Sequence, residues 1–340
     1  MFKKQYFIPE PEEFIAEKPL SPELKKIKQA RDEEIRAVIS GKSNKMLIIV
    51  GPCSAHEPAP TLEYISRLGK LNEEVKDKLV IVPRIYTNKP RTKGVGYKGM
   101  FLQPDPEGAA DIARGIRSIR ALHLAAINES GLTAADEMLY PENTAYVEDL
   151  LSYHAVGARS VEDQLHRQVA SGVEAPVGLK NPTSGSIIAL VNSIFAAQSP
   201  QVFKYGNYQV SSDGNPYAHA ILRGGVDASG VDVPNFHYET VMQLEEMYRG
   251  SKLENPAIII DTNHANSGKQ YKQQIRIAHE VMQNCRFDEK FRHIVKGFMI
   301  ESFLEEGNQK HDDVFGKSIT DPCLGWTDTE RLLRDLAEQI

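Results

Sequence analysis

Short apolar runs rich in β-branched residues recur along the chain, and each is followed by turn residues and a segment with helical spacing. This alternation is typical of strands that alternate with helices. Stretches such as TLEYISRLGKLNEEV and DIARGIRSIRALHLAAI carry the helical spacing. The eight strand-like runs are residues 46–52, 79–86, 134–138, 155–160, 176–181, 218–225, 257–264 and 295–303.

Eight strand and helix units over residues 45–340 predict a (β/α)8 TIM barrel, a fold that usually takes about 250 residues. An open doubly wound sheet is the alternative that the pattern alone leaves open. No glycine-rich nucleotide-binding motif follows the first strand, which weakens that alternative. Residues 1–44 are charged and contain several prolines, with a helix predicted over 22–39, and we interpret them as an N-terminal arm for subunit or effector contacts.

The charge and the cysteines narrow the class of protein. The formal net charge is −6, and the two signs are interspersed, which argues against nucleic acid as the main partner. Three cysteines without a C-x-x-C pair indicate a reducing compartment. No signal peptide is apparent, and no run approaches the roughly 18 apolar residues of a membrane helix. We therefore expect a soluble cytoplasmic protein without a membrane partner.

Polar residues occupy the predicted strand ends, where (β/α)8 barrels carry their chemistry. The ends are Cys53, Arg84, Glu137, Arg159, Lys180, Arg223, Asp261 with His264, and Glu301. Any one basic residue among them could be a solvated loop residue. Together with Lys89 and Arg91 of the loop TNKPRTKGVGYKG, however, the basic residues would form a positive mouth suited to a phosphorylated anion.

A second set of residues offers sulfur, nitrogen and oxygen donors for a first-row divalent metal. The set is Cys53, His264, Glu301 and Asp321, the last in the loop ITDPCLGW. Their spacing matches no metal motif, so the argument rests on the shared barrel mouth. A buried thiol, a hydrogen-bonded histidine, an ion-paired glutamate and a turn-forming aspartate remain the alternatives for the four residues.

Several motifs resemble one family in sequence order. They are GPCSAH, KPRT, GARSVEDQLHRQVASG, PVGLKNPTSG, ILRGG, DTNHANSGKQ and GKSITDPCLGW. From about residue 20 onward the chain strongly resembles the class I 3-deoxy-D-arabino-heptulosonate 7-phosphate (DAHP) synthases. The resemblance implies a (β/α)8 barrel with one divalent metal ion, Mn, Fe, Co or Zn. The implied reaction condenses phosphoenolpyruvate with erythrose 4-phosphate and water to give DAHP and phosphate, the first step of the shikimate pathway.

The resemblance also implies residue roles. The metal ligands would be Cys53, His264, Glu301 and Asp321. Phosphoenolpyruvate would be held by Arg84, Lys89, Arg159, Lys180 and Arg223, and erythrose 4-phosphate by Arg91 and Thr92. We also place Glu137 and Asp261 in the substrate site. Lys89 is the first candidate for proton transfer to the aldehyde, and Cys53 and His264 would contribute to catalysis through the metal.

Two departures from the family concern specificity. The loop KPRTKGVGYKG is one residue longer than the familiar KPRTTVGWKG, and residues 201–225 are shorter than in feedback-regulated bacterial forms, where this segment lines part of the inhibitor pocket. An aromatic amino acid inhibitor and a homodimer or homotetramer are expected. The alternatives are a sister synthase that uses another aldose phosphate and a non-catalytic effector-binding barrel; the KPRT motif and the complete ligand set argue against them.

The cysteines give a further expectation. Cys323 follows Asp321 closely, so we expect it near Cys53, close enough for a disulfide after metal loss in air. A basic pocket would lower the pKa of the Cys53 thiol and favour its oxidation. Cys285 would take no part.

Overall fold

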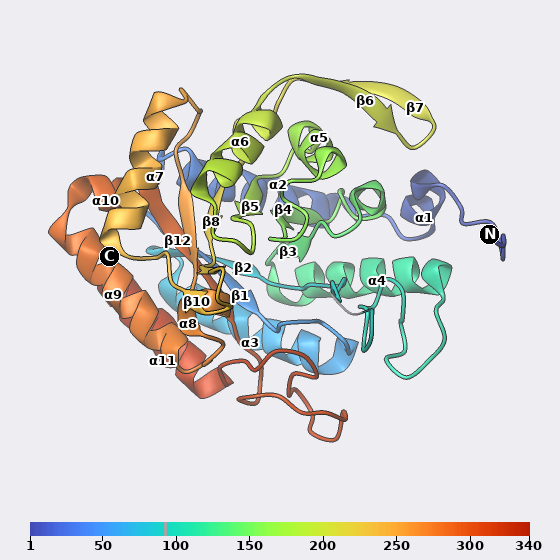
Figure 1. Cartoon of the computed structure of the whole chain (residues 1–340). Helices are drawn as coiled ribbons and strands as arrows, with labels where there is room; N and C mark the ends of the chain where they lie inside the picture. The colour runs from blue at the N-terminus through green and yellow to red at the C-terminus, as the bar shows by residue number, and fades with distance from the viewer. Residues whose placement is uncertain (92–93) are drawn as a thin grey trace.

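A closed barrel of parallel strands forms the centre of the molecule (Figure 1). The computed structural model describes residues 1–91 and 94–340. The barrel strands are β1 (Met46–Gly51), β2 (Leu79–Pro83), β3 (Ala134–Glu137), β4 (Leu151–Val156), β5 (Val177–Lys180), β8 (His219–Leu222), β11 (Ile258–Asp261) and β12 (Val295–Glu301). Their order is β2-β1-β12-β11-β8-β5-β4-β3, and a parallel bridge between Arg84 and Ala135 joins the two ends. The predicted (β/α)8 barrel is confirmed.

The strands are apolar on both faces because both faces are covered. Along β1, Leu47 and Ile49 join a cluster with inward residues of the other strands, such as Val80 and Ile221. The alternate residue Ile48 belongs to the larger cluster beneath the outer helices. The near-continuous hydrophobic runs in the sequence are therefore the signature of a barrel wall.

Helices cover the outside of the barrel. They are α3 (Pro58–Val75), α4 (Ile112–Ser130), α5 (Gln164–Gly172), α6 (Ile187–Gln198), α7 (Tyr238–Gly250), α9 (Gln273–Phe287) and α11 (Trp326–Glu338), with the short α8 (His264–Ser267) and α10 (Glu289–Ile294) beside them. Between β3 and β4 the chain forms only a 3-10 helix, Pro141–Tyr146. The alternation of strands and helices is therefore incomplete at the third unit.

The fourth predicted strand range is displaced, and the second, sixth and seventh each run three residues too far. The fourth strand was expected at 155–160 but spans Leu151–Val156, because the polar Ser152 and His154 interrupt the apolar pattern although both are buried in the strand. The following residues turn at Gly157, whose carbonyl accepts from two later backbone N–H groups. The seventh strand ends at Asp261 rather than at residue 264, since His264 already begins α8.

The N-terminal segment contains α1 (Pro11–Glu17) and α2 (Pro22–Ile39), so the helix predicted over 22–39 is confirmed. The last turns of α2 place Ile35, Val38 and Ile39 against the inward-facing cluster of the barrel. Polar contacts from α2 reach the N-terminal side of the barrel, such as Asp32 with Ser152. The helix therefore closes the end of the barrel opposite the strand C-termini.

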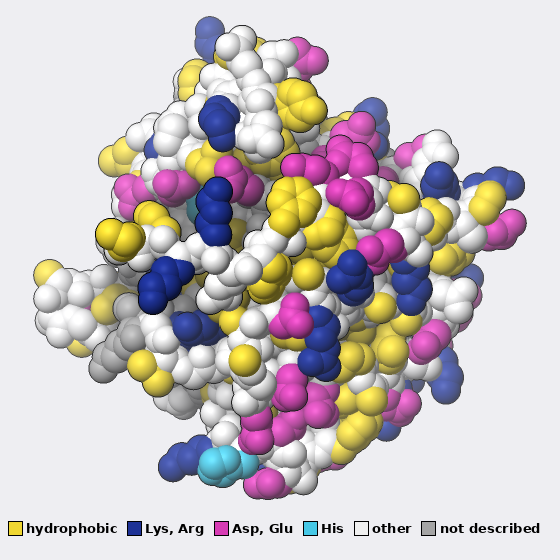
Figure 2. Space-filling model, turned by 90° about the vertical axis from the view of Figure 1, so that its right-hand side faces the viewer, with side chains coloured by type: hydrophobic (Ala, Val, Ile, Leu, Met, Phe, Trp, Pro, Cys, Tyr) yellow, Lys and Arg dark blue, Asp and Glu magenta, His cyan; other side chains and the backbone are white. Residues whose placement is uncertain are grey.

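Two small antiparallel ribbons were not foreseen. The hairpin of β6 (Gln201–Tyr205) and β7 (Tyr208–Ser212) extends beyond the outer helices at the top of Figure 1. A second ribbon pairs β9 (Gly225–Val226) with β10 (Asp232–Val233). Acidic and basic side chains are interspersed on the face that carries α1 and the N-terminus (Figure 2), in line with the sequence argument against a nucleic-acid surface. Within residues 1–91 and 94–340, every helix is too short or too polar to cross a membrane.

Candidate active site at the barrel mouth

The predicted strand-end residues all lie at the C-terminal end of the barrel. Glu137, Lys180, Asp261 and Glu301 are the last residues of their strands, and Arg84 and Arg223 come directly after theirs. Cys53 and Arg159 follow in the turns after β1 and β4. Because parallel strands share this end, residues far apart in the sequence surround one opening.

Three of the four predicted metal ligands meet there. The sulfur of Cys53 and carboxylate oxygens of Glu301 and Asp321 lie within 4.8 Å of one another. The Cys53 thiol donates to Asp321 Oδ2 at 3.4 Å, and both Cys53 and Glu301 are buried. A soft sulfur beside two hard oxygens in a closed site is a donor set that a divalent transition metal accepts.

His264 lies beside this group and is held by a carboxylate. Its Nδ1 is 2.9 Å from Asp261 Oδ2, and its backbone has a φ of 52°, a left-handed conformation that side-chain-bearing residues rarely adopt. Such strain persists where the surroundings fix the residue. A histidine whose Nδ1 donates to a carboxylate presents Nε2 as the ligand atom, which is the arrangement common in metal sites.

The carboxylate of Glu301 is anchored on two sides. Arg84 Nη2 lies 3.0 Å from its Oε1, and Asn263 Nδ2 donates to its Oε2 at 2.6 Å. Burial raises the pKa of Glu301, but Arg84 and then His264 lower it, so that the net pKa is below the usual range. The guanidinium of Arg84 also stacks on Tyr86, with 3.7 Å from Cζ to the ring centroid. Arg84 thus positions Glu301 through an ion pair, while the buried Nε of Arg84 and Oε1 of Glu301 make no hydrogen bond with the described residues.

Lys89 reaches the same group from the loop after β2. Its Nζ lies 2.6 Å from Cys53 Sγ and 3.5 Å from Asp321 Oδ2. Burial alone would lower the pKa of the Lys89 amine, but Cys53, Asp321 and Glu301 raise it well above the usual range. Lys89 is therefore protonated at neutral pH and places N–H donors at this point.

The expected lowering of the Cys53 pKa is wrong. Burial is the largest cause and raises the pKa of the thiol, and Glu301 raises it further, which outweighs the effect of Lys89. Cys323 lies close to Cys53, as expected, since the Cys53 backbone and thiol both act on the Cys323 pKa. Burial raises that pKa as well. A bridge between the two stays a prediction, without the reactive thiolate that was expected to drive it.

The basic residues divide into paired and unpaired groups. Lys180 Nζ lies 2.8 Å from Asp261 Oδ2 in a buried ion pair. Burial is the main cause that lowers the pKa of Arg223, and the nearby Arg159 lowers it further. Nη1 of Arg223 is buried and has no hydrogen-bond partner among the described residues. Two neighbouring guanidiniums with an unused buried donor are groups that could bind an anion.

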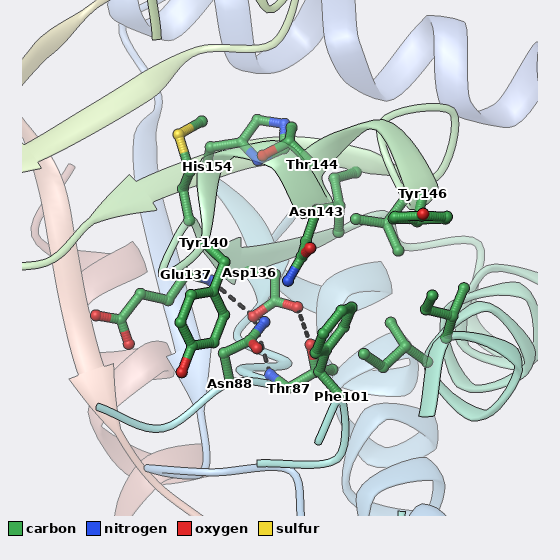
Figure 3. Close-up of a pocket in the computed structure, with 15 residues that line it drawn as sticks. Thr87, Asn88, Phe101, Asp136, Glu137, Tyr140, Asn143, Thr144, Tyr146 and His154 are labelled. Carbon is green, nitrogen blue, oxygen red and sulfur yellow. Dashed lines mark hydrogen bonds between the residues drawn. The ribbon is translucent and has the colours of Figure 1, made fainter. Parts of the chain in front are cut away.

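Two predicted substrate contacts lie in the loop after β2. Arg91 is partly buried, and its Nε donates to the carbonyl of Tyr97 at 2.9 Å, so the guanidinium is anchored within its own loop. Thr92 lies outside the described residues. Glu137 is partly buried, and in Figure 3 its carboxylate points away from Asp136 and Thr87. Its Oε1 would lie 2.3 Å from a Cβ at Gly157, so a larger residue there would displace the Glu137 carboxylate.

Asp136 lies beside the site but was not predicted, because it comes one residue before the end of its strand. Its carboxylate accepts from the Thr87 backbone N–H at 2.9 Å, from the Thr87 hydroxyl and from the Glu137 N–H at 2.7 Å (Figure 3). These bonds fix the start of the loop that carries Lys89. A cavity of about 30 Å³ lies beside them, bordered by Asn143 and His154. The only signal for it in the sequence was an acidic residue within the strand-like run AADEM.

Buried asparagines also escaped the sequence analysis. Asn181 accepts from the Arg223 N–H at 2.9 Å and donates to the Gly224 carbonyl at 2.7 Å. Asn235 donates to Asn181 at 3.0 Å, which extends the network. These amides satisfy the backbone of the β8 turn and so fix the position of Arg223.

Comparison with known proteins decides the family. The family model described as DAHP synthetase I family matches residues 23–334. The chain belongs to this family. The identification made from the sequence motifs is confirmed.

Characterised relatives and a solved structure agree. A Trp-sensitive phospho-2-dehydro-3-deoxyheptonate aldolase of Enterobacter agglomerans is 40% identical over 97% of this chain and 94% of the relative. A Phe-sensitive one of Escherichia coli K12 is 42% identical over 90% of this chain and 87% of the relative. The structure of such an aldolase from Francisella tularensis SCHU S4 has 32% identity and a TM-score of 0.93, with 100% of this chain and 98% of that chain covered. Phospho-2-dehydro-3-deoxyheptonate aldolase is another name for DAHP synthase.

Proposed function

We propose that this chain condenses phosphoenolpyruvate with erythrose 4-phosphate and water to give DAHP and inorganic phosphate, at the mouth described above. One observation carries the proposal: a protonated Lys89 lies against a cluster of Cys53, Glu301 and Asp321 within a ring of basic side chains. Family membership supports the same reaction. A barrel that only binds an effector would not need these donors together.

One divalent ion would be held by Cys53, His264, Glu301 and Asp321. The residues fit such an ion, because three ligand atoms already converge and His264 keeps Nε2 available while Asp261 holds Nδ1. The mixed donors suit Mn²⁺, Fe²⁺, Co²⁺ or Zn²⁺. When bound, an ion at this point polarises a substrate carbonyl as a Lewis acid.

Phosphoenolpyruvate would occupy the basic side of the mouth. Arg159 and Arg223 offer two forks to its phosphate, and Lys180 and Lys89 add ammonium groups nearby. Arg84 would contribute N–H groups that Glu301 and Pro52 leave unused, among them the buried Nε–H. Asp261 sets the positions of Lys180 and His264 at the edge of this site.

Erythrose 4-phosphate would lie toward the loop after β2, where Arg91 and Thr92 would bind its phosphate and Glu137 would face its hydroxyl groups. C3 of phosphoenolpyruvate then attacks the aldehyde carbon, and Lys89 donates a proton to the aldehyde oxygen. The positive charge that develops at C2 is quenched by water, which loses a proton. The bond between C2 and the oxygen that carries the phosphoryl group then breaks as the new C2 hydroxyl loses its proton and becomes the ketone, and phosphate leaves with the bonding electrons. The basic ring positions two anions that otherwise repel each other.

The choice of sugar can be tested directly. Purified protein with divalent metal is supplied with phosphoenolpyruvate and either erythrose 4-phosphate, arabinose 5-phosphate or no sugar, and phosphate release is measured. We expect release with erythrose 4-phosphate only. Release with arabinose 5-phosphate alone would assign the chain to a sister synthase, and no release with either sugar would favour an effector-binding barrel.

We also propose feedback inhibition by an aromatic amino acid, as the names of the Trp-, Phe- and Tyr-sensitive relatives suggest. A pocket of about 190 Å³ between α5 and the β6–β7 hairpin is lined by Val169, Phe203, Tyr205 and Val210. Phosphate release with each aromatic amino acid in turn tests this proposal. Val210→Lys should abolish inhibition, whereas Val202→Lys on the exposed face of the hairpin should retain it.

The N-terminal arm supports a proposed homodimer or homotetramer. Phe2, Tyr6 and Phe7 are exposed there, and clustered exposed aromatic residues are typical of contact surfaces. Deleting residues 1–8 should change the mass measured by light scattering while the fold stays intact. Deleting 1–44 should instead unfold the protein, because α2 closes the barrel end.

All three cysteines are free thiols, which supports the cytoplasm as the proposed location.

A further inference from the structure

A second cluster of metal-binding side chains lies outside the catalytic group. His56, Glu57 and Asp312 place one imidazole nitrogen and two carboxylate oxygens within 4.8 Å of one another. His56 and Glu57 belong to the turn between β1 and α3, and Asp312 to the loop between β12 and α11. The two segments are far apart in the sequence, and they also contact each other through Cys53 with Asp321 and Ser54 with Thr320.

The imidazole of His56 is prepared as a ligand. The residue is 1% exposed, and its ring packs edge-on against Tyr97 and Phe303. Nδ1 lies 3.4 Å from the Ser54 carbonyl oxygen, which makes Nδ1 the donor and leaves the lone pair on Nε2. Nε2 is buried and makes no hydrogen bond with the described residues. A buried nitrogen left without a hydrogen bond carries a cost unless something binds it.

A carboxylate oxygen lies close to that nitrogen. Nε2 lies 3.3 Å from Asp312 Oδ2, but the two atoms are not aligned for a hydrogen bond. Two ligands of a tetrahedral ion with bonds of about 2.0 Å lie about 3.3 Å apart, so this separation already matches two positions around one ion. An ion between the two atoms would explain why they approach each other off the axis of a hydrogen bond.

The two carboxylates of the cluster oppose each other unless a cation lies between them. The Glu57 and Asp312 oxygens lie within 4.8 Å of each other and of a His56 ring nitrogen. Like charges in contact are unfavourable, and a divalent ion removes the repulsion. The side chain of Asp312 is 25% exposed, so an ion and a water molecule can enter from solvent.

We propose that His56, Glu57 and Asp312 form a second binding site for a divalent transition-metal ion such as Zn²⁺, Mn²⁺ or Co²⁺. The nitrogen and oxygen donors distinguish it from the sulfur-containing site at Cys53. An ion bound there ties the loop that leads to Asp321 to the turn that carries Cys53. The site therefore stabilises the closed arrangement of the mouth, and its existence does not depend on the proposed reaction.

Cobalt separates the two sites by spectrum. The metal-free full-length chain is titrated with Co²⁺, and bound metal is counted by equilibrium dialysis with elemental analysis. Thiolate ligation gives a charge-transfer band in the near ultraviolet, whereas a site of nitrogen and oxygen gives none. We expect two equivalents for each chain, only one of which produces the sulfur band.

Variants assign the second equivalent. Asp312→Asn removes an exposed ligand with little risk to folding, and it should weaken the second equivalent at least 10-fold while the sulfur band stays unchanged. Asp313→Asn, at the neighbouring exposed position, should bind both equivalents as the unmodified chain does. Cys53→Ala should lose the sulfur band and keep the other equivalent. Two equivalents of unchanged affinity in Asp312→Asn, or a single equivalent in the unmodified chain, would overturn the second site.

Discussion

The ammonium nitrogen of Lys89 lies 2.6 Å from the sulfur of Cys53, across the barrel mouth from the loop after β2 to the turn after β1. The contact joins the proposed proton donor to a proposed metal ligand. It also explains why Lys89 stays charged although it is largely buried, since Cys53, Asp321 and Glu301 oppose the effect of burial on its pKa. Proton donation and ligand charge are therefore coupled at this point.

Replacing Lys89 by Met should lower kcat about 100-fold or more, in the range typical of a lost general acid. The metal content should stay the same, because the carboxylates and the sulfur remain. Steady-state phosphate release and elemental analysis measure the two quantities. Lys98→Met in the same loop is the matched control, and it should leave both unchanged because Lys98 is exposed. Loss of metal together with activity in Lys89→Met would make Lys89 a support for Cys53 instead of a proton donor.

Arg159→Ala should raise KM for phosphoenolpyruvate and reduce kcat/KM about 10- to 150-fold, which corresponds to one charge-assisted contact of about 1.5–3 kcal/mol. The thermal midpoint should not move, because Arg159 is exposed. Arg167→Ala, near the start of α5, serves as control and should keep the normal KM; its guanidinium contacts only backbone carbonyls nearby. An unchanged KM in Arg159→Ala would remove this residue from the substrate site.

Lys180→Ala should destabilise the fold, unlike Arg159→Ala. Lys180 and Asp261 form a buried pair at 2.8 Å, and removing one partner leaves an uncompensated buried charge. Breaking such a pair typically costs about 3–5 kcal/mol, although His264 would retain part of the compensation here. Urea unfolding of the two variants measures the difference. Equal stability of Lys180→Ala and Arg159→Ala would contradict the structural role of the pair.

Acid should weaken the fold through two buried histidines. Burial lowers the pKa of His154 to about 3 and that of His219 to about 4. In the unfolded chain both titrate near pH 6.5, so between pH 6.5 and about 4 only the unfolded state takes up these protons. The free energy of unfolding therefore has its full value above pH 6.5. As the pH drops below this point it falls, by up to about 1.4 kcal/mol per pH unit for each histidine.

His154→Leu isolates this effect, since it removes one of the two protons. Its free energy of unfolding, measured in urea from pH 7 to 4.5, should depend less steeply on pH than that of the unmodified chain. His311→Gln, at an exposed position, should keep the original slope. The same slope in all three proteins would mean that His154 is protonated in the folded state.

The sequence predicted the barrel and the end at which its polar residues gather, because both follow from the order of strands and turns. The hydrophobic runs located seven of the eight strands to within three residues at each end, but the fourth range was displaced because Ser152 and His154 are buried polar residues. No local sequence pattern predicts that a polar residue will be buried inside a strand. The β6–β7 hairpin was missed for a related reason, since its strands are half exposed and carry little hydrophobic periodicity.

The sequence predicted those site residues whose position follows from the end of a strand. Their ion pairs and hydrogen bonds became visible only in the folded structure. Cys53, Glu301 and Asp321 were expected together and lie together. The ion pairs of Arg84 with Glu301 and Lys180 with Asp261 join residues from different strands, so no spacing could reveal them. The same holds for the asparagine network around Arg223 and for the contact of Asp136 with Thr87. The pKa of Cys53 was misjudged because charge was considered without burial.

The dependence of phosphate release on metal and on Cys53 tests the central claim most directly. Protein treated with a strong chelator and freed of it is supplied with phosphoenolpyruvate and erythrose 4-phosphate, before and after addition of Mn²⁺, Fe²⁺, Co²⁺ or Zn²⁺, and Cys53→Ala is measured in parallel. We predict no phosphate release without metal and prompt recovery with at least one of these ions. Cys53→Ala should release no phosphate at the metal concentrations that restore the unmodified chain. Full activity in the chelated protein, or in Cys53→Ala, would contradict the metal site and the mechanism built on it.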